Sequence, residues 1–488
     1  MATPFPADHP YLNKGFEPIR VEYDYADLVV EGTIPRELNG SLYRIGPNPQ
    51  FAPRGPYNPL LADGMIHAFH IRDGRVAYRN RWVRTQQWQR EHTAGRSLFG
   101  TTGSPRDADP EVAGLQTDGV ANTGLIWHGQ RLLALEEGHA PIQIDPITLE
   151  TLGPWTFAGA LPGNMTAHPK VDPGTGEMFF FANFPNKDFS GALAFYVASA
   201  AGRLTRSEII QGPFPSLVHD FAITADYILF FVCPVTLSME RIRKGASPIG
   251  WEPERGTHIG IFPRGGSTSD IRWFKAPSCM AWHSMNAFQN GEDINLDVCA
   301  QAAPAFPNDK GKAPSDTDLR QYLTRWTMDW SSPSSVVTTR LNGSVCEYPK
   351  IDERCIGIPY RFGFVACAGG PGTGDLFHRA VGRYELETGQ LRSFHFGGSS
   401  AISEAIFAPK SPGSAEGDGY LLLTVFDERR NASYLAIVDA MHIEAGPIAT
   451  AHLDHRVPLG FHGVWRAATV PPHFTAHPSA AILPWRPQ

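Results

Sequence analysis

The sequence lacks a basic cluster and any long apolar run, and both absences exclude classes of function. The chain of 488 residues carries 42 Lys and Arg against 49 Asp and Glu, for a formal charge of −7. Nucleic-acid binding needs a concentrated positive surface, which this sequence does not provide. The most apolar run, residues 227–237, contains a proline and is far shorter than the about 20 residues that cross a bilayer. We therefore expect neither a nucleic-acid partner nor a membrane-spanning helix, while peripheral contact with a membrane stays open.

Cysteine is scarce, and the familiar phosphate-binding and hydrolase motifs are missing. The six cysteines form no C-x-x-C pair, so we expect buried thiols and neither a zinc knuckle nor a disulfide framework. The glycines of GGPGTGDLF from Gly369 do not match G-x-G-x-x-G, and no P-loop, H-E-x-x-H or G-x-S-x-G occurs. Dinucleotide-binding and zincin functions are thereby excluded. The segment MATPFPADHP resembles neither a secretory signal nor a transit peptide, so we expect the cytoplasm.

Glycine and proline are abundant, and they separate many short apolar runs. The chain has 48 Gly and 42 Pro, with turn pairs such as Asp73-Gly74 and Gly129-Gln130 between the runs. Such turns predict tight antiparallel hairpins. The predicted strands cover residues 41–45, 75–83, 131–135, 177–182, 227–232, 293–298, 420–426 and 434–439.

These hairpins recur along the whole chain without a βαβ alternation, which predicts an all-β fold. A sandwich, a barrel and a propeller are the candidates, and the length favours a propeller whose seven four-stranded blades use about 70 residues each. We expect one domain over residues 1–488. Residues 301–321 are predicted to form a surface loop, and the Pro-rich tail after residue 470 an extended strap.

Three of the 18 histidines share a local pattern. His168, His219 and His283 each precede a turn that is followed by a strong apolar strand, and His462 also enters an apolar stretch, although without that turn. If successive blades repeat one hairpin, residues at the same place in it converge on the propeller axis. Neutral imidazoles bind Fe, Zn, Cu or Ni, so four of them predict a metal site. The alternative for each is a hydrogen-bonded core histidine.

Over nearly its entire length the sequence resembles the carotenoid cleavage oxygenase family. The resemblance rests on NGSLYRIGPNP from Asn39, DGMIHAFHIRDGRV from Asp63, VANTGLIWHGQRLLALEEG from Val120, TAHPKVDPGTGEM from Thr166, VHDFAIT, WHSMNAF, CEYPKIDERCIGIPYRFGF from Cys346, SEAIFAPK from Ser403, DGYLLLTVFD from Asp418 and GFHGVW from Gly460. Within the family, WEPERGTHIGIFPRGG from Trp251 and the following DIRWFKAP are most similar to the bacterial branch that cleaves stilbenes and phenylpropenes.

The resemblance implies a seven-bladed propeller with a loop and helix cap over an Fe(II) ion. The ligands would be the same four residues, His168, His219, His283 and His462. It also implies that carboxylates accept hydrogen bonds from three of these histidines, and the matching positions are Glu137, Glu347 and Glu404. A carboxylate fixes the tautomer of a liganding imidazole and offsets charge around a buried dication. Otherwise each of these glutamates is a solvated loop residue.

Two further residues are implied beside the iron. Four ligands leave two positions of an octahedral ferrous ion open, and in the family a residue at the place of Thr123 crowds one of them. Thr123 is equally explained as an ordinary strand residue. Relatives that cleave hydroxystilbenes usually hold the phenol with a Lys immediately before the glutamate that matches Glu137, and with a Tyr after LFG. This chain has Glu136 and Thr102 there, so Glu136 is either the base that takes a phenolic proton or an exposed charge at a strand end.

The sequence therefore predicts a non-haem Fe(II) dioxygenase that uses dioxygen to split the C=C bond of a small aryl alkene, of the stilbene or phenylpropene type, into aldehydes. An aromatic-lined tunnel would hold the substrate. An apocarotenoid is the alternative substrate. A metal-dependent propeller hydrolase and a metal-free interaction scaffold are the alternative functions. Metal content and oxygen consumption distinguish the dioxygenase, the hydrolase and the scaffold.

Overall fold

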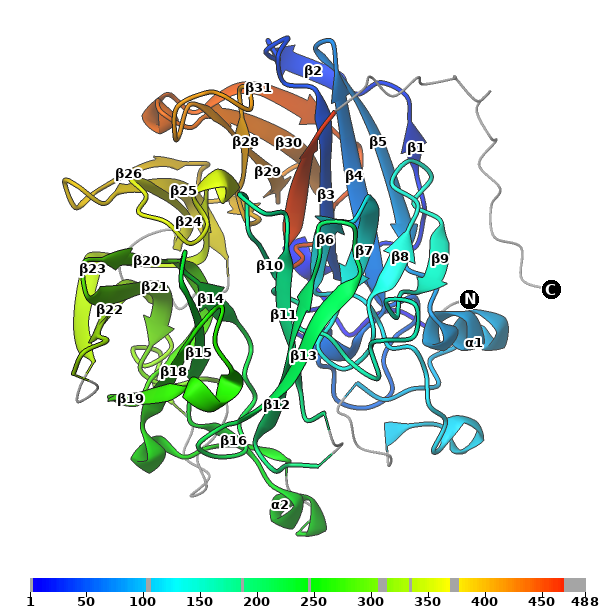
Figure 1. Cartoon of the computed structure of the whole chain (residues 1–488). Coiled ribbons are helices and arrows are strands. Elements are labelled where there is room, and N and C mark those ends of the chain that lie inside the picture. Colours follow the sequence, from blue (N-terminus) through cyan, green and yellow to red (C-terminus); the bar gives the residue numbers. More distant parts are fainter. Residues whose placement is uncertain are drawn as a thin grey trace.

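The computed structural model describes most of the chain, and the fold consists mainly of β-strands (Figure 1). The described residues are 3–101, 107–185, 188–244, 247–305, 314–332, 336–368 and 377–468. Thr102, the predicted strap after residue 470 and residues 306–313 of the predicted loop lie outside them. The all-β prediction is confirmed, and each predicted strand is present with bounds that differ by a few residues at most.

Within the described residues the strands form seven antiparallel sheets, which follow one another around the molecule (Figure 1). One sheet joins both ends of the described chain, in the order β1 (Asp24–Tyr25), β5 (Arg75–Trp82), β4 (Gly64–Arg72), β3 (Gly40–Pro47) and β32 (Gly463–Ala467). Two four-stranded meanders follow: β6 (Gly124–His128), β7 (Arg131–Leu135), β8 (Ile142–Ile144) and β9 (Thr151–Pro154), then β10 (Lys170–Val171), β11 (Met178–Asn183), β12 (Ala192–Ala198) and β13 (Leu204–Gln211).

Three further sheets and a two-stranded ribbon come mainly from the second half of the chain. A four-stranded sheet contains β14 (Phe221–Ile223), β15 (Tyr227–Val232), β18 (Thr257–Pro263) and β19 (Arg272–Ala276), with the separate ribbon β16 (Val235–Leu237) and β17 (Ile249–Trp251). A seven-stranded sheet contains β20 (Met280–Asn290), β21 (Asp293–Gln301), β22 (Tyr322–Asp329), β23 (Val337–Ile351), β24 (Phe362–Ala368), β25 (His378–Glu385) and β26 (Gln390–His395). The last contains β2 (Val29–Gly32), β31 (Pro447–His452), β30 (Ala432–Asp439), β29 (Gly419–Asp427), β27 (Ser400–Ile402) and β28 (Ile406–Pro409).

Helices in the described part of the chain are few and short. The α-helices are α1 (Gln86–Ala94) and α2 (Met239–Arg243). The 3-10 helices are η1 (Lys14–Phe16), η2 (Pro59–Leu61), η4 (Pro110–Val112), η5 (Pro253–Arg255), η6 (Thr268–Asp270), η7 (Glu353–Cys355) and η8 (Ile443–Ala445). Helix α1 begins after Thr85, whose hydroxyl accepts from the backbone of Trp88, and ends at Gly95 with φ 67°. Both caps satisfy backbone groups that a short helix leaves unpaired.

The predicted tight turns set the register of the hairpins. Asp73 and Gly74 join β4 to β5 with φ of 51° and 76°, and Gly129 and Gln130 join β6 to β7 with φ of 54° and 62°. Two central residues with positive φ match the right-handed twist of the flanking strands. Side chains along each hairpin then alternate between the faces of the sheet, which brings apolar residues toward the neighbouring sheet.

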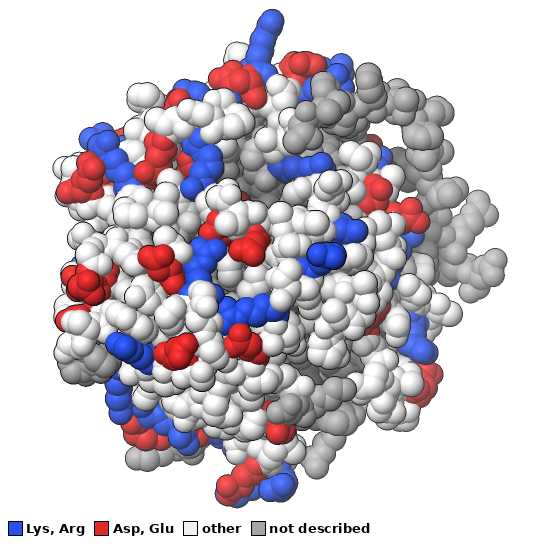
Figure 2. Space-filling model, viewed as in Figure 1, with Lys and Arg blue, Asp and Glu red and all other residues white. Residues whose placement is uncertain are grey.

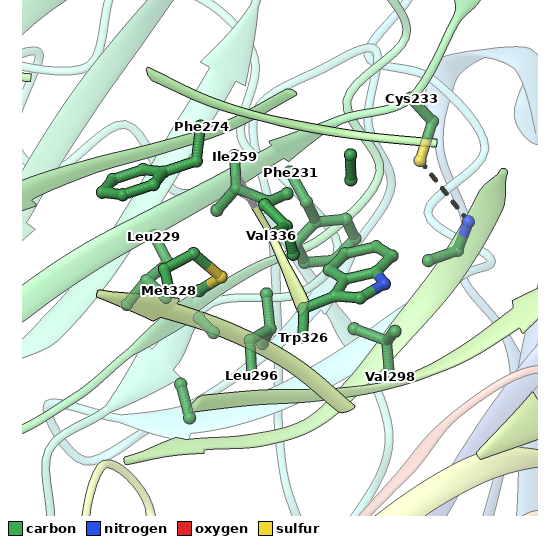
Figure 3. Packing of buried hydrophobic residues seen from close by; sticks show 14 of the residues in the cluster. Leu229, Phe231, Cys233, Ile259, Phe274, Leu296, Val298, Trp326, Met328 and Val336 are labelled. Atoms are coloured by element: carbon green, nitrogen blue, oxygen red, sulfur yellow. Dashed lines mark hydrogen bonds between the residues drawn. The ribbon is translucent and has the colours of Figure 1, made fainter. Parts of the chain in front are cut away.

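The core lies between successive sheets. Figure 3 shows Leu229, Phe231 and Ile259 facing Leu296 and Trp326 of the next sheet, and Trp326 is 1% exposed. Complete burial of each such apolar side chain contributes about 1.5–3 kcal/mol. The dashed line in Figure 3 is the bond from the backbone N of Ala281 to Sγ of Cys233 at 3.4 Å. This contact holds Ala281 of β20, two residues before His283.

All six cysteines are free, as predicted. Cys233, Cys299, Cys346 and Cys367 are buried, but the prediction of burial is wrong for Cys279 and Cys355, which are half-buried. Cys279 immediately precedes β20 and Cys355 ends η7, so both lie outside the sheet interiors.

The surface is mixed in charge. Figure 2 shows Lys and Arg interspersed with Asp and Glu over the visible face, without a field of one sign. No helix in the described part of the chain is long and apolar enough to cross a membrane.

Candidate metal centre

Four histidines lie at equivalent places, at or near an edge strand of four different sheets. His168 comes two residues before β10, and His219 comes two residues before β14. His283 lies within β20, and His462 immediately precedes β32, the strand that pairs with β3. The local pattern in the sequence therefore corresponds to one repeated place in the fold.

The structure brings these four imidazoles together. Nε2 of His219 lies 3.0 Å from Nε2 of His168 and 3.3 Å from Nε2 of His283. One nitrogen from each of these three rings lies within 4.8 Å of the other two, a spacing that suits one metal ion. The ring of His462 lies 4.7 Å from the rings of both His168 and His283.

Each of the three glutamates lies beside one histidine. Nδ1 of His283 lies 2.8 and 2.9 Å from the two carboxylate oxygens of Glu347. Nδ1 of His462 donates to Oε1 of Glu404 at 2.9 Å. Nδ1 of His219 lies 2.7 Å from Oε1 of Glu137, an ion-pair distance, although the two atoms are not aligned as a hydrogen bond.

These contacts fit a cation at the point where the rings meet. A carboxylate accepts but does not donate, so it directs the proton of a neutral imidazole to Nδ1 and leaves the lone pair on Nε2. The lone pairs of His219 and His283 then face each other across 3.3 Å and repel. A metal ion bound to both nitrogens removes the repulsion. Without the metal a proton does so, in agreement with the pKa of His219, where burial lowers the value but Glu137 outweighs it and raises it.

Burial keeps two of the other histidines uncharged. Burial and the neighbouring histidines hold the pKa of His168 well below its ordinary value. Burial also lowers the pKa of His462 to about 4, against the opposing charge of Glu404. Metal ligation requires neutral imidazole, so these two rings are ready ligands at neutral pH.

Bulges in two strands direct the site residues. Strand β20 loses register on both sides of Ser284, next to His283, and β23 loses register between Glu347 and Lys350. Tyr348, inside the second bulge, has φ of 53°, an uncommon conformation for a bulky residue. A bulge re-aims side chains that strict alternation would send to opposite faces. Here the bulge of β23 directs Glu347 to His283 and Lys350 to a second carboxylate, Glu404.

Glu404 is held from several sides. Lys350 Nζ lies 3.1 Å from its Oε1, and the backbone N of Gly463 donates to Oε2 at 2.8 Å. Nη1 of Arg44 donates to the backbone carbonyl of Glu404 at 3.0 Å and lies 3.9 Å from Oε2. Burial raises the pKa of Glu404, but Lys350, His462 and Arg44 outweigh it and hold the pKa far below the ordinary value. The carboxylate is therefore ionised.

Two aromatic rings pack against the histidines. Trp282 meets His219 edge to face at 5.0 Å, and Tyr348 stacks against His283 at 5.7 Å. Such rings limit the rotation of the imidazoles and exclude water from their edges.

The tunnel that the sequence predicts stays a prediction. A hollow of about 780 Å³ beside α1 is lined by residues such as Gln89, Arg90 and Glu111 and does not include the histidines.

Thr123 occupies the corresponding place in a further sheet, immediately before β6, and is buried. Its hydroxyl donates to Oδ1 of Asn122 at 2.8 Å. A Cβ on the next residue, Gly124, would lie 2.5 Å from the carbonyl oxygen of Ala167, which precedes His168. The start of β6 thus packs directly against a histidine-bearing segment.

Glu136 is buried, and both of its oxygens are engaged. Oε1 forms an ion pair with Nδ1 of His139, and Oε2 accepts from the backbone N of Val120 at 3.1 Å. The bond to Glu136 raises the pKa of His139. Of the two alternatives drawn from the sequence, the exposed charge is wrong, because the side chain is turned inward. The role as a base stays a prediction.

Five further residues contact the site without having been predicted from the sequence: Lys170, Asp220, Ser284, Lys350 and His139. The first three adjoin histidines of the site in the chain, and that adjacency was the available signal. Lys350 and His139 gave no comparable signal, because their partners are set by a bulge and by a loop.

Comparison with known proteins agrees with this geometry. The sequence profile of the family described as "RPE65: Retinal pigment epithelial membrane protein" matches residues 16–467. Isoeugenol monooxygenase from Pseudomonas nitroreducens is 36% identical, over 92% of this chain and 96% of the relative. The crystal structure of Pseudomonas brassicacearum lignostilbene dioxygenase superposes with a TM-score of 0.90 at 32% identity, over 96% of this chain and 100% of that one. A variant of the Synechocystis apocarotenoid oxygenase gives 0.84 at 30%, over 94% and 98%. The chain therefore belongs to the carotenoid oxygenase family that this profile describes.

Proposed function

We propose that this protein is a non-haem Fe(II) oxygenase that cleaves the C=C bond of an aryl alkene to aldehydes. His168, His219, His283 and His462 hold the ion in this proposal. The single observation that carries the proposal is the close approach of three ring nitrogens. Nε2 of His219 lies 3.0 Å from Nε2 of His168 and 3.3 Å from Nε2 of His283. The similarity to an isoeugenol monooxygenase and a lignostilbene dioxygenase supports the substrate class.

The donor set argues against calcium and leaves iron and zinc as the candidate metals. Calcium prefers oxygen ligands and is a poor match for four imidazoles, whereas zinc is chemically possible. When bound, a ferrous ion supplies the redox chemistry by which one dioxygen and one alkene become two carbonyl fragments, without a reduced cofactor. Oxygen consumption distinguishes iron from zinc.

The chain's own residues supply position and a dry environment. Glu347 and Glu404 hold Nδ1–H of two ligands, so that the rings present Nε2 in fixed directions. Glu137 has the corresponding task at His219. Thr123, at the equivalent place in a further sheet, is proposed to shield one open coordination position without binding there. Its methyl group is suited to this role because the hydroxyl is engaged by Asn122.

Glu136 is proposed to act on the substrate through its pair with His139. A general base must lie within hydrogen-bond reach of the proton that it takes. Since both carboxylate oxygens already accept bonds, the role requires the pair to open or the proton to pass to His139. The pair replaces the Lys that relatives cleaving hydroxystilbenes use, and so we propose an aryl alkene other than one clamped by that Lys.

We further propose that the chain forms one seven-bladed propeller. The first part of β23 pairs with β22 and its last part pairs with β24, so the seven-stranded sheet divides into two units of four strands that share β23. The sheets other than the ribbon then give seven units of four or more strands. One strand from each of several successive units contacts the next, in the order β14, β20, β23, β28, β32 and β6. Gly124 against Ala167 and the bond from Thr166 to the carbonyl of His219 continue this ring of contacts back to β14. Pairing of β32 with β3 and of β2 with β31 joins the chain ends to the ring.

A substrate panel tests the proposed activity. Isoeugenol, non-phenolic styrenes, hydroxylated stilbenes and apocarotenals are incubated with iron-loaded protein, and aldehyde formation and oxygen consumption are measured. We expect the aryl alkenes to be cleaved fastest, with isotopic dioxygen entering the products. Preference for apocarotenals favours the alternative that the Synechocystis enzyme suggests. A requirement for NADH or 2-oxoglutarate, or cleavage without oxygen uptake, contradicts the proposal.

A further inference from the structure

Asp220 accepts four bonds although its side chain is almost completely buried. Its Oδ1 lies 2.7 Å from Nζ of Lys170 and accepts from the backbone N of Phe221 at 2.8 Å. Its Oδ2 accepts from the backbone N of Ser284 at 2.8 Å and from the hydroxyl of Ser284 at 2.7 Å. The side chain of Asp220 is 1% exposed and that of Lys170 is 19% exposed. Burying a carboxylate so deeply is costly unless such partners compensate it.

The partners of Asp220 adjoin three histidines of the site. Asp220 directly follows His219, Ser284 directly follows His283, and Lys170 comes two residues after His168. These segments begin three different sheets, so no backbone ladder among the described strands holds β10, β14 and β20 to one another. One carboxylate therefore joins three segments that the sheets leave separate.

The same carboxylate stabilises the bulge that contains His283. Register between β20 and β21 is lost on both sides of Ser284, and the N–H of Ser284 points to Asp220. A bulge is a local departure from regular pairing, and its direction depends on what satisfies the displaced backbone groups. Because His283 is the preceding residue, the bond to Ser284 sets the direction from which its ring enters the site.

We propose that Asp220 is a positioning residue of the metal centre, which fixes the mutual placement of His168, His219 and His283 through Lys170 and Ser284. Asp220 and Lys170 carry opposite charges, so the pair adds no net charge near the ion, and its contribution is geometric. The inference rests on the proposed metal centre. It adds an inter-sheet clamp to the three glutamates, each of which orients a single ring.

Metal binding to Asp220→Asn and Ser284→Ala tests this role. Cobalt(II) is titrated anaerobically into the full-length protein against a competing chelator, and the visible ligand-field absorption is recorded. The matched control is Asp418→Asn, because Asp418 pairs with Lys410 at 2.5 Å in an exposed position. Lys170→Arg keeps the cation and serves as the conservative variant. Unfolding of each metal-free variant is followed separately.

We expect wild type and Asp418→Asn to bind one Co(II) with the same spectrum, and Lys170→Arg, which keeps the charge, to bind it more tightly than Asp220→Asn does. Asp220→Asn should bind about 10 to 100-fold more weakly, the usual cost of losing a partner that orients ligands, and with a shifted ligand-field band. Ser284→Ala should change both quantities in the same direction by less, which preserves the test if Asp220→Asn does not fold. Wild-type affinity and spectrum in both Asp220→Asn and Ser284→Ala overturn the inference while leaving the metal centre intact. Absence of metal binding in wild type overturns the proposed function itself.

Discussion

Oε1 of Glu404 lies 2.9 Å from Nδ1 of His462 and 3.1 Å from Nζ of Lys350. One carboxylate oxygen thus connects a proposed ligand with a cation from another sheet. The side chain of Glu404 is only 1% exposed, so its negative charge needs partners inside the protein. Removing Lys350 would take away one of them. The orientation of His462 therefore depends on a residue that does not touch it.

Replacement of Lys350 by Met should destabilise the protein. Breaking a fully buried pair costs about 3–5 kcal/mol, and we expect about 1–3 kcal/mol here, because a quarter of the Lys350 side chain is exposed and water screens the pair. Denaturant unfolding of the metal-free protein measures the change. Lys410→Met, which breaks the exposed pair with Asp418, is the control and should change stability by less than 1 kcal/mol. Equal effects of the two substitutions would contradict a special role for Lys350.

Replacement of His219 by Ala should abolish stoichiometric iron binding and activity. It removes the ring whose Nε2 contacts those of both His168 and His283. Elemental analysis of protein prepared with iron gives the result. His442→Ala is the control, because that side chain is 78% exposed and pairs with Asp439, which does not belong to the cluster. Full activity of His219→Ala, or zinc alone in the active wild type, would refute the ligand assignment.

Replacement of Glu404 by Gln should have a milder effect than loss of a ligand. An amide still fills the space but lacks the charge that holds Nδ1–H of His462. We expect measurable iron and a loss of about 10 to 100-fold in metal affinity or turnover. Iron content and initial rates at saturating substrate separate the two quantities. An effect as complete as that of His219→Ala would place Glu404 among the ligands instead.

Replacement of Glu136 by Lys should shift the substrate preference toward hydroxystilbenes. An ammonium stabilises a developing phenolate, which a carboxylate repels, and we expect a gain on the order of tenfold relative to non-phenolic styrenes. Ratios of kcat/KM across the panel measure it. His139→Gln tests the pair separately, since it releases Oε1 of Glu136 without changing the carboxylate. A wild type that cleaves resveratrol-like stilbenes best, and equally well after Glu136→Ala, would show that this residue does not face the substrate.

The metal-free protein should lose stability as the pH falls from about 6.5 to about 4. Burial, with help from His455 and Arg44, lowers the pKa of His67 to about 3, and burial with Arg79 lowers that of His70 to about 4. As the pH falls below about 6.5, both residues become protonated in the unfolded chain but stay neutral in the folded protein. Each therefore lowers the free energy of unfolding by up to about 1.4 kcal/mol per pH unit. His139 and His219, whose pKa values are raised, act in the opposite direction and lose their contribution as the pH rises.

Urea unfolding across this pH range checks the expectation. His67→Gln combined with His70→Gln should reduce the dependence without abolishing it, because His168 and His462 also have lowered pKa values. The exposed His442→Asn should leave it unchanged. A wild-type stability that stays constant between pH 6.5 and 4 would mean that other groups balance the two buried histidines.

Local sequence determined the strands and their turns. Asp73-Gly74 and Gly129-Gln130 adopt positive φ at both residues, and the strand between Tyr227 and Val232 has the predicted bounds, because turn chemistry and alternating hydrophobicity act over a few residues. The pattern before each strand also identified the four histidines, although their role as ligands stays a proposal.

Tertiary structure decided which groups meet. The pair of His283 and Glu347 and the pair of Asp220 and Ser284 each span 64 residues, and both depend on the bulges of β20 and β23. A shift of one residue in register would turn each side chain to the other face of its sheet, and nothing in the local sequence marks where the shift occurs. The partners of Glu136 could not be predicted from the local sequence either, although they are close in the chain. The fold turns its carboxylate toward His139 and the backbone of Val120. Composition and periodicity specify faces and turns, whereas packing between sheets selects the partners.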